Sequence, residues 1–191
     1  MKLFDPGEFD RAKVRRWARG FCPARSVAEL SELEPQALYD AGKRLVLLDM
    51  DNTLVGWRSE EIPASTREWI ATAQGVGLQL CVISNTRHPA RLARLAKEMK
   101  IDYRTGKFKP SRTMYLAALA HYGATPDQAV MIGDQIFTDI WGANRSGIEA
   151  VLVARLTPRD FVATKLSRLG ERLLRPHLRR GHRRASNESS Q

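Results

Sequence analysis

Polar and acidic residues follow short apolar runs in this chain, at the places where buried strands of a parallel sheet would end. The run Leu45–Leu48 is followed by Asp49-Met50-Asp51-Asn52-Thr53, and the run Val130–Ile132 is followed by Gly133-Asp134. Residues i and i+2 of a strand point to the same side, so we expect the carboxylates of Asp49 and Asp51 to face one spot. Taken alone, an Asp-x-Asp sequence is more typical of a polar turn than of a catalytic site.

Three further segments carry residues of the same kind. Ser84-Asn85-Thr86 follows the apolar run Leu78–Ile83 and precedes a helical stretch, where a hydroxyl and free amide groups suit a phosphate. Lys109 precedes the next expected helix, and Asp139 lies at the start of the last one. Each feature alone is also typical of a helix cap or a solvated surface charge. Together they indicate one site, because ligands of open parallel sheets bind outside the carboxyl ends of the strands.

The elements that would position these residues alternate along the middle of the chain. We expect strands at 45–48, 78–83, 130–132 and 150–153, and helices at 64–74, 89–99, 111–122 and 138–146. Such alternation implies right-handed crossovers and a parallel sheet, which predicts a doubly wound, Rossmann-like α/β domain over residues 43–156. Outside it we expect an N-terminal helical segment packing on the core over 1–42, a basic amphipathic helix over 157–184 and a disordered tail over 185–191.

The order of these motifs, Asp-x-Asp-x-Thr, Ser, Lys and Gly-Asp-x4-Asp, resembles that of the haloacid dehalogenase (HAD) superfamily of phosphotransferases. The resemblance covers roughly residues 43–156. Superfamily members usually carry a cap domain inserted after the first or the third motif region. Here the intervals 52–83 and 86–108 already hold expected helices and strands and leave no room for a cap. The resemblance is therefore to the uncapped members, subfamily III, whose open site suits a substrate too large to be enclosed.

The chemistry expected from the residues agrees with this resemblance. Three carboxylates and a phosphate dianion would repel one another without a cation, and carboxylates with a substrate phosphate are the usual setting for Mg²⁺. A carboxylate nucleophile divides phosphoryl transfer into two steps through an acyl phosphate. Lys109 and the Ser84 hydroxyl would stabilise the transferring oxygens.

The resemblance also implies a role for each motif residue. Asp49 would be the nucleophile and a metal ligand, and Asp51 the general acid and then base, with its backbone carbonyl on the metal. Asp134 would bind Mg²⁺, and Asp139 would orient a metal-bound water or Lys109. The residues that would hold the phosphate are Thr53, Ser84, Asn85 and Lys109. The second carboxylate, Asp51, distinguishes phosphatase members from dehalogenases and predicts hydrolysis of a phosphomonoester.

Finer details narrow the resemblance to one branch. The sequences Gly133-Asp-Gln-Ile-Phe-Thr-Asp139 and Asp49-Met-Asp-Asn-Thr-Leu-Val-x-Trp57 are similar to those of YqeG-type bacterial proteins and mitochondrial phosphatidylglycerophosphate phosphatases. That branch implies an anionic lipid headgroup as substrate. A soluble metabolite, a nucleic-acid end or a phosphoprotein remains an alternative substrate, and a non-catalytic basic binding module an alternative function. No chemical role follows for Gln135 or Phe137.

Positive charge is concentrated near the C-terminus. The chain has 191 residues and a formal net charge of +10, and residues 155–184 hold ten Arg or Lys but two acids, Asp160 and Glu171. Such a helix could bind an anionic membrane surface or dock on the domain through Val162, Leu166, Leu169 and Leu173. Nucleic acid would be attracted by the same charge, but no recognised motif accompanies it. Without a signal-peptide-like start or an ~18-residue apolar run, we expect a cytoplasmic protein with, at most, peripheral contact to the inner face of the membrane.

Overall fold

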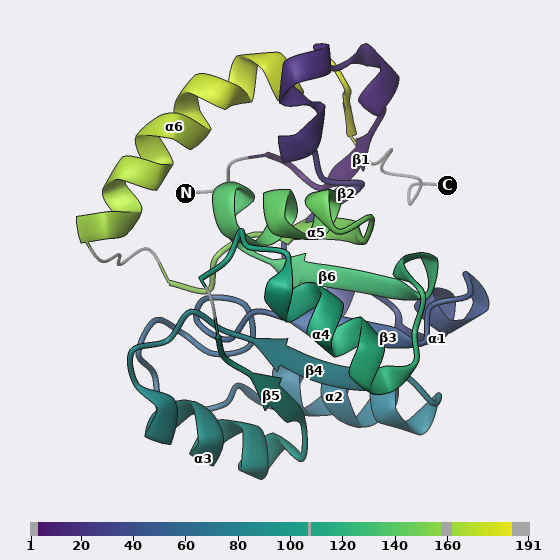
Figure 1. Cartoon of the computed structure of the whole chain (residues 1–191), viewed down its shortest axis with the longest axis vertical. Coiled ribbons are helices and arrows are strands. Elements are labelled where there is room, and N and C mark those ends of the chain that lie inside the picture. The colour runs from purple at the N-terminus through teal and green to yellow at the C-terminus, as the bar shows by residue number, and fades with distance from the viewer. Residues whose placement is uncertain (1–3, 107, 158–161, 185–191) are drawn as a thin grey trace, which may run out of the picture.

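A mixed, mostly parallel β-sheet forms the centre of the molecule (Figure 1). The computed structural model describes residues 4–106, 108–157 and 162–184. Its sheet has the strand order β5-β4-β3-β6-β7-β2-β1-β8, parallel from β5 to β2 and antiparallel at β1 and β8. The strands are β1 (Gly7–Phe9), β2 (Arg25–Val27), β3 (Leu45–Leu48), β4 (Gln79–Ile83), β5 (Asp102–Arg104), β6 (Ala129–Gly133), β7 (Glu149–Val153) and β8 (His182–Arg184).

Helices cover both faces of this sheet. The α-helices are α1 (Pro35–Asp40), α2 (Ala64–Gly75), α3 (Pro89–Met99), α4 (Thr113–Tyr122), α5 (Trp141–Arg145) and α6 (Val162–Leu178). Short 3₁₀ helices lie at Arg11–Lys13, Arg16–Phe21, Leu30–Glu32 and Pro126–Gln128, and a π-helical turn at Ile136–Ile140 leads into α5. This is the doubly wound α/β architecture expected from the sequence. Within the described chain, the intervals 52–83 and 86–108 are filled by α2, β4, α3 and β5, so no cap domain is present there.

Strand side chains divide between two cores, one on each face. Along β3, Val46 and Leu48 join the core under α1, α2 and α3, whereas Leu45 and Leu47 join the core under α4, α5 and the end of α6. All four are fully buried, which explains why a strand covered on both faces is a continuous apolar run instead of an alternating one.

The described residues of the segment 1–42, expected to be helical, include two strands as well as short helices. Residues 7–9 and 25–27 are strands that extend the sheet, with β2 parallel to β7 and β1 antiparallel to β2. Both are short and contain charged residues, and the β7 residues with which β2 pairs lie more than a hundred positions away, so no local pattern indicates them. Trp17, in the 3₁₀ helix Arg16–Phe21, is 56% exposed.

Helix α6 docks on the domain through its C-terminal half. Leu174 and Leu178 are buried, whereas Leu173, expected to face the core, is 68% exposed. The difference arises because Glu171 faces inward, which sets the buried stripe at positions 171, 174 and 178. The side chains of Val162, Leu166 and Leu169, Asp160 and the tail 185–191 lie outside the described part of the structure. Among the described helices, none combines the length and apolar character needed to cross a bilayer.

Candidate active site

Asp49 lies at the point where a fully buried strand ends. Strand β3 stops at Leu48, and the Asp49 amide continues the ladder by donating to the Ile132 carbonyl at 3.0 Å. Its carboxylate Oδ1 lies 2.5 Å from Nζ of Lys109. Both side chains are almost completely buried, with 10% of Asp49 and 2% of Lys109 exposed. The strand therefore delivers a carboxylate to a cation in a nearly dry environment.

Lys109 is held at both its backbone and its ammonium group. The Asn85 side chain accepts from the Lys109 amide at 2.7 Å and donates to its carbonyl at 3.3 Å. The ammonium donates to Asp49, to Asp139 Oδ1 at 2.6 Å and to the Ile83 carbonyl at 2.9 Å. Burial alone would lower the pKa of Lys109, but Asp139 and Asp49 raise it well above its ordinary value, so the ammonium stays charged.

Asp139 is fully buried within the π-helical turn that follows β6. Its Oδ2 accepts from the Gln135 amide at 3.1 Å, while Oδ1 binds Lys109. The side chain lies against Gly133, where an added Cβ would come within 2.4 Å of Oδ2. Gly133 is therefore required for this close approach. π-Helical turns of this kind are frequent at functional sites.

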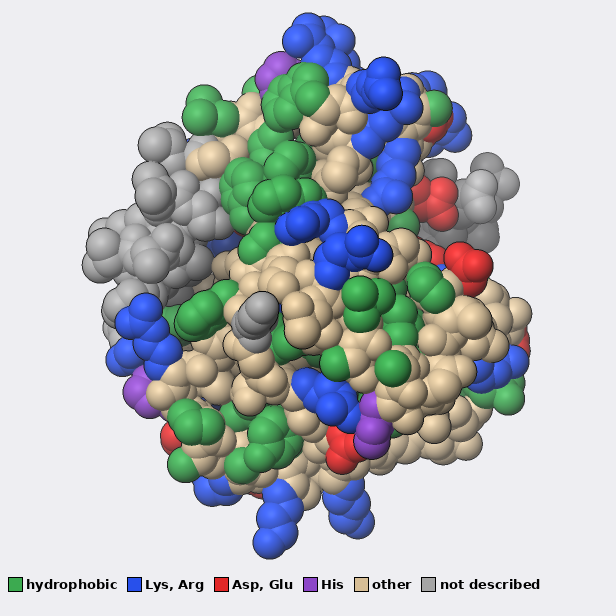
Figure 2. All heavy atoms as spheres, in the orientation of Figure 1, with side chains coloured by type: hydrophobic (Ala, Val, Ile, Leu, Met, Phe, Trp, Pro, Cys, Tyr) green, Lys and Arg blue, Asp and Glu red, His purple; other side chains and the backbone are tan. Residues whose placement is uncertain are grey.

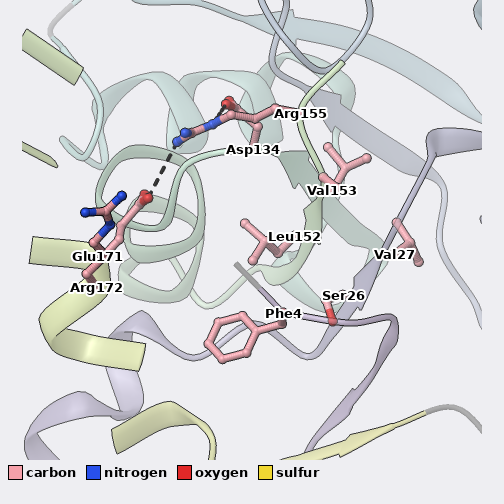
Figure 3. Close-up of a pocket in the computed structure, with 10 residues that line it drawn as sticks. Phe4, Ser26, Val27, Asp134, Leu152, Val153, Arg155, Glu171 and Arg172 are labelled. Carbon is pink, nitrogen blue, oxygen red and sulfur yellow. Dashed lines mark hydrogen bonds and ion pairs between the residues drawn. The ribbon is translucent and has the colours of Figure 1, made fainter. Parts of the chain in front are cut away.

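Asp134 ends strand β6 beside Asp49 and is paired with Arg155 (Figure 3). The Arg155 Nε donates to Asp134 Oδ2 at 2.7 Å. The other oxygen, Oδ1, is buried and has no hydrogen-bond partner among the described residues. A buried carboxylate oxygen without a donor is costly unless a cation or water completes it.

These carboxylates form a group that fits a metal ion. One oxygen each of Asp49, Asp134 and Asp139 lies within 4.8 Å of the others. Burial and the neighbouring carboxylates raise the pKa of Asp49 to about 7 and that of Asp134 to about 8, although Lys109 and Arg155 oppose the rise. Three carboxylates facing two cations leave an excess of negative charge, which a divalent cation with oxygen ligands would neutralise. The unpartnered Asp134 oxygen is the observation that most directly favours such an ion.

The Asp51 carboxylate is not part of this group, contrary to the expectation that it would share one spot with Asp49. It accepts from the Arg58 amide at 3.2 Å and pairs with Arg91 of α3 at 3.0 Å. The strand has ended before it, and the chain turns at Asn52, whose φ is 67°, so the alternation rule of a strand no longer holds. Both carboxylates still line the same cleft.

The remaining residues expected to hold a phosphate are placed differently from one another. Ser84 is nearly buried at the floor of the cleft and accepts from the Thr86 amide at 3.2 Å. Asn85 also lines the cleft, but its side chain is used to fix Lys109. Thr53 is 1% exposed and does not line the cleft, and its hydroxyl has no hydrogen-bond partner among the described residues.

The cleft above Asp49 has a volume of about 510 Å³ and is lined by aromatic and basic side chains. Aromatic side chains form one set and basic side chains another, and Phe108 is 63% exposed at the edge. The aromatic residues are Trp57, Phe108, Phe137 and Trp141, and the basic ones are Arg58, Arg87, His88 and Arg91.

Three residues of this region were not identified as site residues from the sequence patterns. Arg155 follows the end of β7 and could have been found by the strand-end rule that identified Asp49 and Asp134. Arg91 lies within α3, where the sequence pattern indicates the apolar face of the helix and assigns no role to the arginine. Glu171 is one acid in a basic segment, and no local signal marks it as buried.

The chain is similar in sequence to known hydrolases. A family model for HAD-hydrolase-like proteins matches residues 108–157. The probable phosphatase YqeG of Bacillus subtilis is 27% identical over 163 residues, which cover 85% of this chain and 94% of that protein. The chloroplastic/mitochondrial phosphatidylglycerophosphate phosphatase 1 of Arabidopsis thaliana is 31% identical over 170 residues, covering 83% of this chain but 49% of that protein. This chain belongs to the HAD superfamily.

Structural similarity agrees with the assignment of the HAD fold. The cobalt-bound deoxy-D-mannose-octulosonate 8-phosphate phosphatase of Haemophilus influenzae superposes with a TM-score of 0.50 at 15% identity, over 72% of this chain and 90% of that one. At this identity the similarity concerns the fold alone. The sequence relatives and the site geometry together identify an uncapped HAD phosphatase.

Proposed function

We propose that this HAD phosphatase hydrolyses phosphomonoesters with Mg²⁺ through an aspartyl-phosphate on Asp49. The observation that carries the proposal is the convergence of Asp49, Asp134 and Asp139 oxygens within 4.8 Å of one another, with Asp49 lining an open cleft and the ammonium of Lys109 bound to Asp49 and Asp139. Mg²⁺ is the proposed ion because all the candidate side-chain ligands are hard carboxylate oxygens. When bound, the ion would neutralise the carboxylates and the phosphate and polarise the phosphoryl oxygens.

The residues around the cleft account for both steps of the reaction. Asp49 attacks phosphorus while the bond from phosphorus to the ester oxygen breaks, and Asp51 gives the leaving oxygen a proton. Asp51 then takes a proton from water as that water attacks phosphorus, which frees Asp49 and inorganic phosphate. Lys109 and the Ser84 hydroxyl are suited to the charge that develops on the phosphoryl oxygens. Asn85 and Asp139 fix Lys109.

We infer that the substrate is a large amphiphilic phosphomonoester, with phosphatidylglycerophosphate as the leading candidate. The similarity to a plant phosphatase of that name supports this choice. The cleft supports it further, because an uncapped site lined by both aromatic and basic side chains suits a ligand that carries a second anionic group and apolar chains.

The basic end of the molecule supports contact with an anionic bilayer. The 3₁₀ helix Arg16–Phe21 packs beside the end of α6, and the Trp17 and His177 rings lie 5.0 Å apart. Trp17 and Leu173 are exposed there next to exposed arginines, including Arg172 and Arg179. Figure 2 displays Lys and Arg side chains clustered at this end, at the top of the view. Each such charge near anionic lipid contributes about 1 kcal/mol.

A substrate comparison tests the proposal. Phosphate release from phosphatidylglycerophosphate in mixed micelles would be measured beside an aryl phosphate and a panel of soluble phosphomonoesters, each with Mg²⁺ and with a chelator. We expect activity on all esters to require the cation and kcat/KM to be highest for the lipid. Arg87→Gln should lower kcat/KM for the lipid more than for the aryl phosphate, whereas Arg94→Gln, on the same side of the molecule but outside the cleft, should change neither. A preference for a soluble ester would reject the lipid substrate and leave the phosphatase mechanism standing.

A further inference from the structure

An ionic chain connects the C-terminal helix to Asp134 (Figure 3). Arg155 lies between two carboxylates, with Nε 2.7 Å from Asp134 Oδ2 and Nη2 3.5 Å from Glu171 Oε2. The exposed side-chain fractions are 1% for Asp134, 13% for Arg155 and 5% for Glu171. These groups come from β6, from the residues after β7 and from α6, so three separate elements meet at one buried network.

Glu171 also binds the loop that follows Asp134. Its Oε1 accepts from the Ile136 amide at 3.0 Å, two residues beyond Asp134. The helix approaches this loop closely, since a Cβ added to Gly170 would lie 2.8 Å from the ring of Phe137. Glu171 therefore holds the loop at a backbone amide and, through Arg155, at the carboxylate of Asp134.

A purely structural role explains this arrangement poorly. A buried ion pair contributes little net stability compared with apolar residues of similar size, so docking of α6 alone would be served as well by another leucine beside Leu174. The network does have a specific geometric effect, because it fixes one oxygen of Asp134 and leaves the other, Oδ1, buried without a described partner. That oxygen belongs to the residue that gathers with Asp49 and Asp139.

We propose that Arg155 and Glu171 are positioning residues for the divalent cation, and that α6 is thereby part of the metal site. Arg155 fixes the rotation of the Asp134 carboxylate so that Oδ1 faces the cation, and Glu171 fixes both Arg155 and the loop that carries Asp134. Neither residue contacts the reacting atoms. The inference rests on the proposed function, in which Asp134 is a metal ligand.

Direct metal binding tests the inference on the full-length protein. Binding of Mn²⁺, used as a probe for Mg²⁺, would be titrated by electron paramagnetic resonance and by calorimetry. Loss of a group that orients a metal ligand typically weakens metal affinity by about 10- to 100-fold. We expect a weakening of that order in Arg155→Gln and in the nearly isosteric Glu171→Gln, with partial recovery in Arg155→Lys. Arg172→Gln, which alters the exposed neighbour of Glu171 on the same helix, is the matched control and should bind Mn²⁺ normally.

Two readouts separate positioning from simple stabilisation. Thermal unfolding of each metal-free variant would be measured in parallel, because a structural role would lower Tm without changing the Mn²⁺ affinity of the folded protein. Unchanged Mn²⁺ affinity in Glu171→Gln and Arg155→Gln would overturn the inference, and the second variant serves if the first does not fold. Asp134→Asn distinguishes the two levels of the proposal: normal Mn²⁺ binding in that variant would refute the metal site itself.

Discussion

At the scale of single residues, the buried carboxylates of the site are neutralised by only a few cationic side chains among the described residues. Lys109 serves Asp49 and Asp139 together, and Arg155 serves Asp134. Truncating one member of such a buried group leaves an uncompensated charge, whereas exposed charges elsewhere are worth little. The consequences of substitution should therefore differ sharply between Lys109 and the exposed lysines.

Replacement of Lys109 should impair both catalysis and folding. In Lys109→Met we expect kcat for an aryl phosphate to fall by about 10²- to 10³-fold, since a group that stabilises the transferring oxygens is lost. The free energy of unfolding should fall by roughly 3–5 kcal/mol because two buried carboxylates lose their partner. Phosphate release and urea unfolding measure the two effects. Lys100→Met, at the exposed end of α3, is the control, and equal losses in both variants would contradict the assignment.

The raised pKa values of Asp49 and Asp134 predict an unusual pH dependence of stability without metal. Their ordinary value is 3.8, and in the folded protein it rises to about 7 and about 8. Between pH 4 and 8 the folded state therefore holds more protons than the unfolded state, and the free energy of unfolding should decrease as pH rises, by up to about 1.4 kcal/mol per unit for each group.

Urea unfolding in a chelator at pH 5 and pH 8 would measure this loss. Excess Mg²⁺ should reverse it at pH 8 and do little at pH 5, because the cation competes with protons for the same oxygens. The metal-free Asp134→Asn variant should depend less on pH than the wild type. An identical pH slope in the two proteins would show that Asp134 does not titrate as proposed.

At the scale of elements, the turn from β6 into the π-helical segment determines where Asp134 and Asp139 lie. Gly133 permits this turn because the carboxylate of Asp139 occupies the space where a Cβ would be. A side chain at this position has to displace either the turn or the acid.

We expect Gly133→Ala to weaken Mg²⁺ activation. The added methyl group would move Asp139 away from Lys109, so the Mg²⁺ concentration needed for half-maximal phosphate release should rise at least severalfold. Gly75→Ala provides a matched control, since nothing lies within 4 Å of a Cβ added at that helical glycine. That substitution should be neutral or stabilise by a few tenths to about 1 kcal/mol. Equal Mg²⁺ dependence in both variants would contradict the role of Gly133.

The properties of the individual strands determine which of them the sequence could predict. The central strands β3, β4, β6 and β7 are long apolar runs, and burial on both faces is a local and readable requirement. Strands β1, β2 and β8 are three residues each and owe their existence to pairing with distant segments, so no window of sequence contains the cause. Asp51 lines the cleft with Asp49, but its pairing with Arg91 depends on the path of the turn at Asn52, which no local pattern predicts.

At the scale of the whole molecule, the two ends of the chain close on each other. Strand β8 pairs with β1, and the end of α6 packs near the N-terminal 3₁₀ helices (Figure 1). Leu178 is fully buried in the same core as residues of α4 and α5. We infer that α6 unfolds together with the catalytic domain and not as an independent appendage.

Two leucines of α6 test this cooperativity. Leu178→Ala should lower the free energy of unfolding by about 2–5 kcal/mol, the range for a fully buried leucine. Leu173→Ala, at a position 68% exposed, should change it by less than about 0.5 kcal/mol. Tryptophan fluorescence and circular dichroism should report one common transition in each protein. A separate early transition in Leu178→Ala would mean that α6 is attached independently of the core.

The location of the covalent phosphate tests the central claim most directly. The enzyme would be mixed with a ³²P-labelled aryl phosphate and Mg²⁺, quenched in acid within milliseconds, and the labelled peptide identified by mass spectrometry. We predict hydroxylamine-sensitive label on Asp49, absent in Asp49→Asn and greatly reduced when a chelator replaces Mg²⁺. Label on another residue, or undiminished label in Asp49→Asn, would contradict the account.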